Sequence, residues 1–395
     1  MKIVQINTVT NGCTGKIAYS IKKVSEDHGH ECIIAYGRGK KENNNGYRIS
    51  NFLDSNFHGI LTRIFDSAGL HSKLVTKKFL KMLDEYKPDI IHIHNLHGYY
   101  INYEILFDYL KRNNICTFWT LHDCWPFTGH CPYYTYVQCD RWKTECHNCP
   151  QKHHHPASFV FDRSNRNYFD KKRAFLGMKD LTIITPSNWL KKEVEQSFLG
   201  IYDVVHIPNG INMDMFHPTH NKFRTYNGLK DKIIVLGVAN LWALTKGLQY
   251  FQILQDILPK DKFQIVLVGL SSKQKKGLKK GIIGIEKTEN IEELIDIYSS
   301  ADIFVNPTLE DNFPTTNLEA LACGTPVITF KTGGSPEAID STCGLVVDKS
   351  VEALAEACLK LGKKSEKISQ QCCIKAKTYD EKKCFGGYLD LYESI

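Results

Sequence analysis

Hydrophobic and polar positions along the chain follow two alternating periods. Short apolar runs rich in isoleucine and valine alternate with longer stretches in which apolar residues recur about every 3.6 positions. This alternation is typical of parallel βαβ units, so we expect an α/β fold. In the first half, the predicted strands span 2–7, 31–35, 89–94, 115–121, 181–185 and 204–207. The predicted helices between them span 15–28, 74–86, 103–112 and 188–198.

A second series of the same kind follows a polar connection. Pro208-Asn209-Gly210 is a turn sequence, and the polar stretch after it runs to Gly228. We therefore expect two α/β domains of similar size, 1–205 and 206–375, followed by a helical tail. The second series has predicted strands at 232–238, 263–268, 281–285, 303–306 and 326–330. Its predicted helices span 247–258, 291–300, 314–322 and 351–361.

One segment, about 122–156, breaks the alternation because it is aromatic, rich in cysteine and irregular. Long irregular connections in compact domains usually have a function, so we interpret it as an insertion after a strand. Four cysteines of this segment are candidate zinc ligands: Cys131, Cys139, Cys146 and Cys149. The last two have the C-x-x-C spacing that suits tetrahedral zinc. A structural zinc site that orders a lid is one hypothesis. Four reduced thiols, or a disulfide formed after isolation, are the alternatives.

The composition indicates a globular protein but does not identify its function. The chain has 395 residues, of which 42% are hydrophobic and 24% charged, as in ordinary soluble globular proteins. Its 14 cysteines are too few for a disulfide scaffold. The first residues lack the apolar core of a signal peptide, and no apolar run is long enough to span a bilayer. We therefore expect a cytoplasmic protein whose net charge of +7 suits anionic substrates or an anionic membrane surface.

Several common catalytic motifs are missing from the sequence. The first loop, around Gly12 and Gly15, has the wrong spacing for a Walker A loop, and Ile17 stands where that motif needs Ser or Thr. No G-x-G-x-x-G follows the first strand of either half, and there is no G-x-S-x-G or H-E-x-x-H. These absences weigh against nicotinamide-dependent, kinase-type, α/β-hydrolase and zinc-protease functions.

The most informative stretch lies between residues 306 and 337. A predicted strand ends at Asn306, an acidic loop follows, and a helix opens at Phe313-Pro314. The first turn of that helix directs backbone N–H groups and a partial positive charge toward the strand end, where ligands of open α/β sheets bind. The carboxylates nearby repel phosphate but accept hydrogen bonds from sugar or ribose hydroxyls: Glu310, Asp311 and Glu319. The pattern fits a nucleotide-sugar, and a capped surface helix is the alternative.

Two further loops could contact an anion. Lys246-Gly247 lies between a strand and a helix, where the lysine could offer a point charge to phosphate. The run Thr332-Gly333-Gly334 follows another strand and allows a ligand to approach the backbone closely. A solvated lysine and a simple tight turn are the respective alternatives.

Together these motifs resemble the retaining glycosyltransferases of family 4. The resemblance rests on Pro208-Asn209-Gly210, Lys246-Gly247, the acidic loop with Glu319-Ala320, Gly324-Thr325-Pro326-Val327 and the Gly-Gly-x-Pro-Glu run. It implies the GT-B fold, in which two Rossmann-like domains face each other across a cleft. It also implies donor binding in 208–375, acceptor binding in 1–205 and a last helix, 376–395, that packs back on the first domain. The segment from His122 to Gly129 is most similar to that of bacterial capsular, exopolysaccharide and colanic-acid-type enzymes.

The resemblance assigns donor-side roles to residues of the second half. Asp311, or Glu310 one residue earlier, takes the place of the first acid of the family's Glu-x7-Glu motif, and Glu319 takes that of the second, which binds the ribose. Lys246 matches the phosphate lysine, whereas Asn240 stands where the family usually has an arginine. The helix opening would present backbone to the transferred sugar and phosphate through Asn312, Phe313, Pro314, Thr315 and Thr316.

The resemblance also assigns roles in the first half. His122 matches a histidine that faces the reacting sugar, and the Gly-rich first loop faces donor phosphate and acceptor through Asn11, Gly12, Thr14 and Gly15. We place four more residues on the acceptor side: His94, His97, Asp123 and Trp125. His92 and His94 share a strand face with His97 close behind, which invites a metal interpretation. We favour core histidines, because no acidic residue is spaced to complete a metal site.

Two basic runs are candidate membrane contacts. Lys273 to Lys280 contains five lysines in a loop of the second half, and Lys171-Lys172-Arg173 lies in the first half. Contact with anionic lipid is the functional hypothesis and a solvated surface is the alternative.

We therefore expect a retaining glycosyltransferase of surface polysaccharide biosynthesis that needs no catalytic metal or other cofactor. Its donor would be a UDP- or GDP-sugar, and its acceptor a saccharide carried on a polyprenyl diphosphate at the inner face of the cell membrane. A catalytically weak partner protein that binds sugar nucleotides is the alternative. We expect no nucleic-acid binding, because the sequence has no aromatic–basic stripe.

Overall fold

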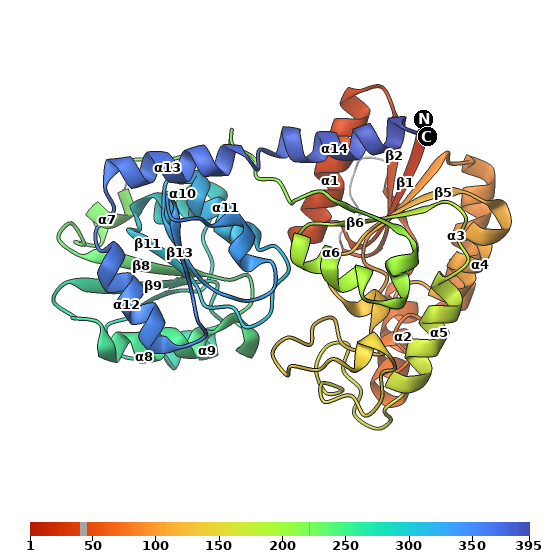
Figure 1. Ribbon diagram of the computed structural model, residues 1–395, viewed down its shortest axis with the longest axis horizontal. Helices are drawn as coiled ribbons and strands as arrows, with labels where there is room; N and C mark the ends of the chain where they lie inside the picture. Colours follow the sequence, from red (N-terminus) through yellow and green to blue (C-terminus); the bar gives the residue numbers. More distant parts are fainter. Residues whose placement is uncertain (40–45, 221) are drawn as a thin grey trace. The chain divides into compact units, whose positions relative to one another are not determined.

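The computed structural model describes residues 1–39, 46–220 and 222–395 and divides into two compact units (Figure 1). Unit 1 is Met1–Pro208 together with Cys384–Ile395, and unit 2 is Asn209–Lys383. The chain therefore leaves unit 1 inside the predicted Pro-Asn-Gly turn. It rejoins unit 1 at Cys384, within the last helix, rather than at residue 376.

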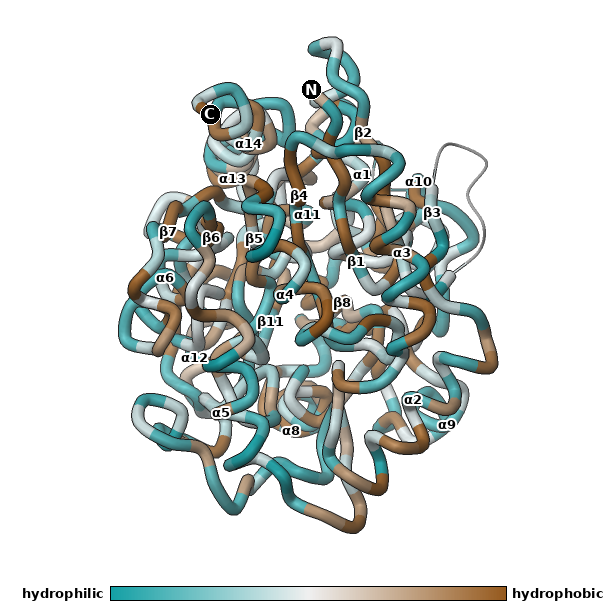
Figure 2. The backbone as a smooth tube through the Cα atoms, turned by 90° about the vertical axis from the view of Figure 1, so that its right-hand side faces the viewer, coloured by the Kyte–Doolittle hydropathy of each residue, from teal (hydrophilic) through white to brown (hydrophobic). Residues whose placement is uncertain are grey.

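Unit 1 is built on a seven-stranded sheet in which every strand pair is parallel, in the order β3-β2-β1-β4-β5-β6-β7. The central strands are buried, and Figure 2 shows hydrophobic residues along β1, β4 and β5. The strands are β1 Lys2–Val9, β2 Glu31–Arg38, β3 Gly46–Arg48, β4 Ile90–Ile93, β5 Cys116–Thr120, β6 Leu181–Thr185 and β7 Asp203–His206.

The helices of unit 1 include two that the hydrophobic pattern did not predict, α2 and α5. Helix α2 buries only polar or small residues, and α5 buries Tyr168 and Phe175 among four polar residues, so neither shows a clear apolar period. Asn51, Asn102 and Ser187 cap α2, α4 and α6 by accepting a backbone N–H three residues later. The helices are α1 Gly12–Asp27, α2 Phe52–Phe65, α3 Lys73–Tyr86, α4 Tyr103–Asn113, α5 Ser164–Phe175, α6 Asn188–Glu195 and α14 Glu381–Glu393.

Unit 2 repeats this plan with a six-stranded parallel sheet in the order β10-β9-β8-β11-β12-β13. Its strands are β8 Ile233–Val238, β9 Phe263–Val268, β10 Ile283–Ile285, β11 Ile303–Asn306, β12 Val327–Phe330 and β13 Gly344–Val347. Its helices are α7 Lys222–Tyr226, α8 Leu248–Ile257, α9 Ser272–Lys276, α10 Ile291–Ser300, α11 Thr315–Ala322, α12 Val351–Leu361 and α13 Glu366–Lys377.

Each sheet has one point at which the strand order reverses. In unit 1, β1 lies between β2 and β4, and in unit 2, β8 lies between β9 and β11. Loops that leave the carboxyl ends of β1 and β4, or of β8 and β11, diverge to opposite faces and leave a crevice in which ligands of open α/β sheets bind. These two switch points are therefore where functional side chains are expected to gather. In the part of the chain that the structure describes, no helix is long and apolar enough to cross a bilayer.

The last helix joins unit 1 through buried tyrosines. Tyr392 is fully buried, and its hydroxyl lies 2.5 Å from Nδ1 of His92 on the central strand β4. Tyr388 is also buried, 3.4 Å from the Thr120 hydroxyl at the end of β5. These contacts couple the C-terminus to the middle of the sheet of unit 1.

We predict that Tyr392→Ala lowers the free energy of unfolding of the protein by about 3–5 kcal/mol, because it leaves a cavity in the core. Tyr392→Phe keeps the ring but removes a partner of His92, and it should cost about 1–3 kcal/mol. The exposed residue Asp390 on the same helix provides the control, since Asp390→Ala should change little. Thermal and urea unfolding test this, and equal stability of all three variants would contradict the packing described.

Candidate functional site

The switch point of unit 2 brings Lys246 to the acidic loop after β11. Lys246 ends a short 3-10 helix, Leu244–Lys246, and Gly247 then turns the chain with φ +79°. A Cβ atom at Gly247 would lie 2.3 Å from the carbonyl oxygen of Pro307, so only glycine allows this close approach. As a result, Nζ of Lys246 lies 2.5 Å from Oδ2 of Asp311, and the lysine side chain remains 37% exposed.

The structure separates the two candidates for the first acid of this loop. Asp311 contacts Lys246, and its other oxygen, Oδ1, accepts the backbone N–H of Asn312 at 3.0 Å. Glu310 is buried, with Lys349 as an electrostatic neighbour: burial lowers the pKa of Lys349, and Glu310 raises it. Asp311, which matches the motif by spacing, is therefore the acid that meets the lysine.

The helix after the acidic loop opens at the same sheet edge. Pro314 occupies the N-cap position of α11, and no side chain caps the helix. Phe313 points into the core of unit 2 and packs on Tyr379, while its carbonyl accepts the Asn209 amide at 3.1 Å. The first turn of α11, Thr315 and Thr316, is therefore positioned by a buried aromatic ring rather than by a cap. The helix begins one residue later than predicted.

Glu319 lies one turn further along α11, half-buried. One of its carboxylate oxygens accepts the hydroxyl of Tyr298 at 2.9 Å. Burial, reinforced by Glu319, raises the pKa of Tyr298, which keeps that hydroxyl protonated and donating. The carboxylate is thereby held in one orientation, with further acceptor positions for a ligand hydroxyl.

A buried polar network that the sequence did not reveal ties together the loops of unit 2. The amide of Asn306, at the end of β11, donates to Oδ1 of Asn317 at 2.8 Å, and Asn317 donates to the carbonyl of Ser335 at 3.1 Å. The hydroxyls of Ser335 and Thr329 are 2.7 Å apart. Nearby, Thr332 is buried, and its hydroxyl has no hydrogen-bond partner among the described residues. Asn240, at the end of β8, is exposed.

In unit 1, the first loop differs from the prediction. The sequence pattern placed Gly12 and Thr14 in a loop, but α1 begins at Gly12, with Asn11 in the N-cap position and no side-chain cap. Gly12 has φ +71°, and a Cβ atom at Gly15 would lie 2.4 Å from the Thr10 carbonyl carbon. Both glycines are therefore needed for the close passage from β1 into α1 at the switch point.

His94 and His122 form a hydrogen-bonded chain that starts at Gln5. Nε2 of His94 lies 2.9 Å from Oε1 of Gln5, and Nδ1 of His94 lies 3.0 Å from Nε2 of His122. Because the Gln5 oxygen only accepts, Nε2 of His94 carries a proton; His122 then donates through Nε2, which leaves its Nδ1 with the lone pair. Burial lowers the pKa of His122 to about 4 and that of His94 well below its usual value, so both are neutral at pH 7.

His92 lies beside His94 with ring centroids 4.3 Å apart, as the shared strand face predicted. Its two nitrogens contact the Tyr392 and Thr120 hydroxyls, so it is part of the core. Within the described ranges, no group of three or more His, Cys, Asp or Glu side chains is arranged to hold a metal ion. The favoured interpretation of these histidines as core and contact residues agrees with this geometry.

Asp123 pairs with His97 rather than with its neighbour His122. Oδ2 of Asp123 lies 2.8 Å from Nε2 of His97, and Oδ1 accepts the backbone N–H of Trp125 at 2.9 Å. Burial raises the pKa of Asp123, but His97 and the Trp125 N–H lower it further, so the carboxylate stays ionised. Trp125 itself is 1% exposed and packs in the core of unit 1. Because it is buried, Trp125 supports the His97–Asp123 pair from the core of unit 1.

One residue of the two basic runs, Lys171, is not available to a membrane. Lys171 is 1% exposed, and its ammonium group donates to the carbonyls of Trp125 and Thr128 and lies 3.4 Å from the centre of the Trp125 ring. Burial lowers the pKa of Lys171 to about 7. The prediction of a lipid contact through Lys171 is therefore wrong, because this residue anchors the cysteine-rich segment to α5.

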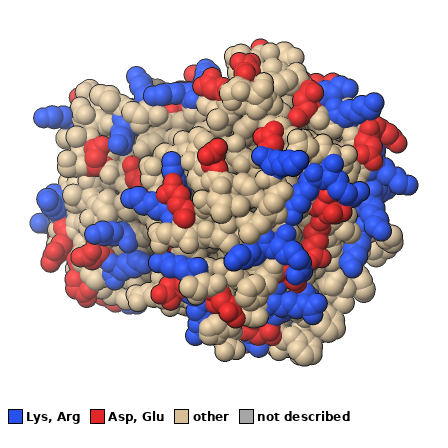
Figure 3. All heavy atoms as spheres, turned by 45° about the vertical axis from the view of Figure 1, so that its right-hand side comes forward, with Lys and Arg blue, Asp and Glu red and all other residues tan. Residues whose placement is uncertain are grey.

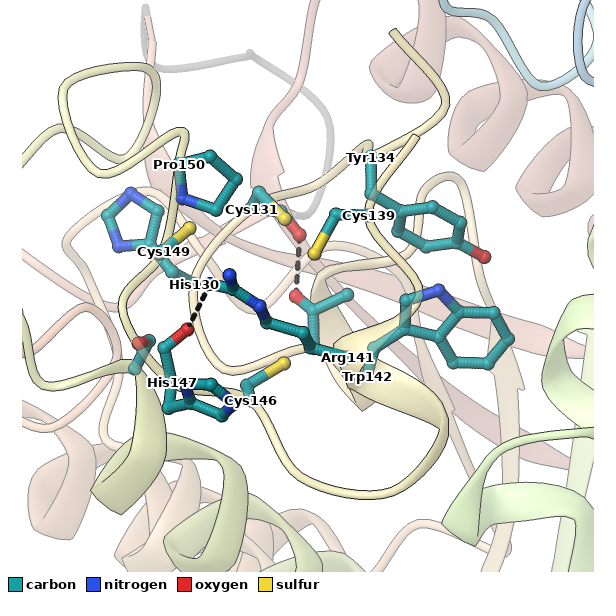
Figure 4. Close-up of a pocket in the computed structure, with 12 residues that line it drawn as sticks. His130, Cys131, Tyr134, Cys139, Arg141, Trp142, Cys146, His147, Cys149 and Pro150 are labelled. Atoms are coloured by element: carbon teal, nitrogen blue, oxygen red, sulfur yellow. Dashed lines mark hydrogen bonds between the residues drawn. The ribbon is translucent and has the colours of Figure 1, made fainter. Parts of the chain in front are cut away.

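The cysteine-rich segment has almost no regular secondary structure, only the 3-10 turns Trp125–Phe127 and Arg141–Lys143. Its four predicted cysteines line a single cavity of about 20 Å³, with Tyr134 and Trp142 in the wall (Figure 4). None of the four is in a disulfide: Cys131, Cys139, Cys146 and Cys149.

The contacts around this cavity hold its walls together. The thiol of Cys131 hydrogen-bonds to Cys149, and Sγ of Cys146 accepts the Gly129 N–H at 3.2 Å. Arg141 donates to the carbonyls of two residues in the loop between Cys146 and Cys149, at 2.8 and 2.6 Å. His130 lines the cavity, but its Nδ1 lies 2.5 Å from Oδ1 of buried Asp66.

Comparisons with known proteins agree with this architecture. Residues 15–215, which are 201 of the 395, match the family Glycosyltransferase Family 4, and residues 232–364 match Glycosyl transferases group 1. The putative colanic acid biosynthesis glycosyl transferase WcaC of Escherichia coli (strain K12) is 26% identical over 275 residues, which cover 66% of this chain and 64% of WcaC. A Campylobacter jejuni N,N'-diacetylbacillosaminyl-diphospho-undecaprenol alpha-1,3-N-acetylgalactosaminyltransferase is 28% identical over 204 residues, 47% of this chain and 53% of the relative. The chain thus spans less than two thirds of either relative.

Solved structures match the whole chain. Sucrose-phosphate synthase from Thermosynechococcus elongatus has a TM-score of 0.73 at 15% identity, covering 100% of this chain and 99% of that protein. Anabaena HepE in complex with UDP-glucose has a TM-score of 0.66 at 13% identity, covering 100% of both chains. Such distant likeness establishes the fold, and the family match covers half of the sequence. The chain is therefore a member of glycosyltransferase family 4 with the GT-B fold.

Proposed function

We propose that this protein transfers a sugar from a nucleoside-diphosphate donor to a saccharide acceptor, with retention at the anomeric carbon. The observation that carries the proposal is the Lys246–Asp311 pair beside the uncapped N-terminus of α11, at the switch point of unit 2. A partly exposed cation and a helix N-terminus without a side-chain cap at one sheet edge are the groups that a diphosphate needs.

In this proposal the diphosphate displaces Asp311 from Lys246. The pair is only partly buried, so breaking it costs little, and a diphosphate offers the lysine a larger charge. The buried, unpartnered hydroxyl of Thr332 is a further donor for the ligand. Glu319, held by Tyr298, accepts ribose hydroxyls. The absence of an arginine at Asn240 leaves Lys246 and the start of α11 to stabilise charge on the leaving diphosphate.

On the acceptor side, we assign His122 to sugar positioning. It is neutral at pH 7, and the hydrogen-bond chain from Gln5 fixes its tautomer, with Nδ1 as the acceptor nitrogen. With a pKa of about 4 it is not in the imidazolium form at neutral pH and so does not act as a general acid. We therefore route the acceptor proton to the departing donor phosphate, on the face from which the diphosphate leaves.

The relatives support a narrower proposal for substrate and place. HepE was solved with UDP-glucose, WcaC is named for colanic acid biosynthesis, and the Campylobacter relative is named for an undecaprenyl-diphosphate-linked acceptor. We propose a UDP-sugar donor, ahead of a GDP-sugar, and a polyprenyl-diphosphate-linked acceptor in surface polysaccharide biosynthesis at the cytoplasmic face of the membrane. Because Asn240 stands where the family usually has an arginine, it favours one alternative, a catalytically weak protein that only binds sugar nucleotides. Detection of donor turnover would distinguish an enzyme from such a binding protein.

We predict that Lys246→Ala lowers kcat/KM for sugar transfer by about 10²–10³-fold, because the leaving diphosphate loses its cation. The double variant Lys246→Ala/Asp311→Ala should recover part of this loss if an unpaired Asp311 repels the donor. Lys260→Ala, at an exposed lysine of the same unit, is the matched control. Transfer from radiolabelled UDP-sugar measures the effect, and unchanged transfer in Lys246→Ala would refute the proposed site.

We predict that Glu319→Gln weakens UDP binding about tenfold or more, because a charge-assisted bond to the ribose becomes a neutral one. The glutamine keeps an acceptor for Tyr298, so the fold should be unaffected. Isothermal titration calorimetry with UDP gives the dissociation constant, and Glu366→Gln on α13 serves as control. Equal affinities would show that the ribose lies elsewhere.

We also propose that the four cysteines of the 122–156 segment bind a structural zinc ion. The C-x-x-C spacing and the shared cavity support this, as does the lack of backbone ladders that would otherwise order the segment. The thiols do not converge on one point, so a bound ion would have to draw them inward. His130 is engaged with Asp66, which leaves four thiolates as the ligand set.

We expect about one zinc ion per chain after purification without chelators, measured by plasma mass spectrometry. Cys131→Ser should abolish binding and lower the melting temperature, whereas Cys373→Ser, at a half-buried cysteine of unit 2, should retain the metal. Thiol titration of the unfolded chain separates the alternatives. Fourteen thiols and no metal would mean reduced cysteines, and twelve would mean a disulfide; either result rejects the zinc site.

A further inference from the structure

Helix α2 is packed with its polar side inward. The residues it buries are His58, Gly59 and Thr62, whereas most of its large apolar side chains point to solvent. In an ordinary surface helix the apolar stripe faces the core, so α2 has the reverse arrangement. The exposed fractions of its apolar side chains are 73% for Phe52, 76% for Leu53, 63% for Phe57, 54% for Ile60 and 46% for Phe65.

The orientation of α2 is fixed by hydrogen bonds on its buried side. The backbone N–H of Gly69 donates to Nε2 of His58, so the proton of that ring is on Nδ1, which donates to Ser72 at 2.8 Å. The Ser72 hydroxyl in turn donates to Asp54 on the first turn of α2 at 2.6 Å. Rolling α2 to bury its apolar side would break this chain, which explains why those side chains stay exposed.

A neighbouring segment extends the exposed apolar surface. Phe159, Val160 and Phe161 are 61%, 57% and 53% exposed. The Phe159 and Phe161 N–H groups donate to the carbonyls of Arg63 and Ile64 at the end of α2, at 2.7 and 3.1 Å. The rings of Phe161 and Phe65 stack with centroids 5.7 Å apart. We call the combined surface the apolar face; it consists of Phe52, Leu53, Phe57, Ile60, Phe65, Phe159, Val160 and Phe161.

Cationic side chains border the apolar face on one side. Phe65 and Phe161 also line an open groove of about 850 Å³. Its charged residues are the cations Lys73, Arg163, Arg166 and Arg173 and the carboxylates Glu104, Asp162 and Asp170. Lys77 and Lys81 continue a row from Lys73 along α3 at helical spacing, and all three lysines are exposed. Figure 3 shows Lys and Arg spread over one face of the molecule, with Asp and Glu among them.

We propose that the apolar face inserts into the interface of a bilayer that contains anionic phospholipids, with the groove and the α3 lysines on the lipid phosphates. Protruding phenylalanine and leucine beside basic residues is the pattern of helices that lie in a membrane interface. The proposal deepens the proposed function, because a polyprenyl-linked acceptor would lie in the same bilayer.

The full-length protein should sediment with phosphatidylcholine vesicles that contain phosphatidylglycerol, and much less with phosphatidylcholine alone. Phe57→Ser/Ile60→Ser should reduce vesicle affinity at least tenfold without changing the melting temperature, since both residues are exposed. Tyr226→Ser/Leu359→Ser, at exposed apolar positions of unit 2, should bind as wild type does. Lys73→Glu/Lys77→Glu should remove the dependence on phosphatidylglycerol.

Vesicle affinity that is unchanged in Phe57→Ser/Ile60→Ser, or absent in the wild type, overturns the proposal. A wild-type dimer that this variant converts to a monomer, seen by light scattering, would instead assign the face to a second copy of the chain. Sugar transfer to a detergent-solubilised acceptor is measured separately. If transfer fails while vesicle binding holds, the proposed function is wrong and the membrane face stands.

Discussion

The reversal of strand order within each parallel sheet is the constraint on which the candidate site of each unit depends. In each sheet the chain lays down strands on one side of a central strand and then on the other, so loops from β1 and β4, or from β8 and β11, diverge at one edge. That divergence places the first loop and His94 in unit 1 and the lysine and acidic loop in unit 2. Gly12 and His94 follow β1 and β4, and Lys246 and Asp311 follow β8 and β11. Residues far apart in sequence therefore meet without any long ordered loop.

The strand order brings the side chains of each site close together, and buried hydrogen bonds then fix their orientations. Gln5 fixes the tautomer of His94 and, through it, that of His122, while Tyr298 fixes Glu319. The Lys246–Asp311 pair differs because it is partly exposed and weakly held. The groups held in one orientation are hydrogen-bonded to buried partners, whereas Lys246 is partly exposed. This division agrees with a site that binds a charged ligand by exchange.

The sequence predicted most of the elements with a clear apolar period and missed two helices whose buried faces are mainly polar. The bounds of β6, β9, β11, α10 and α12 agree with the hydrophobic periods. Helices α2 and α5 were missed because their inner faces carry His58, Asn167 and Lys171, for which no periodicity rule exists. In the site, spacing identified Asp311, but the Asn306–Asn317–Ser335 network left no signal because its partners meet only in the folded chain. Trp125 was assigned by motif alone, and a motif does not show burial.

The polar packing of α2 explains how unit 1 can have both a hydrogen-bonded inner face and an exposed apolar face on the same helix. A helix that satisfies its inner face with hydrogen bonds, as α2 does through His58, needs no apolar residues there. Its apolar residues become available for another environment, and hydrophobic burial outside the molecule can replace burial within it. Because those inner bonds involve Gly69 and Ser72, at the turn into α3, they also fix α2 relative to the lysine row on α3. The apolar face and the lysine row would therefore form one rigid surface for membrane insertion and phosphate contact. A loop with the same residues would not hold them in fixed positions.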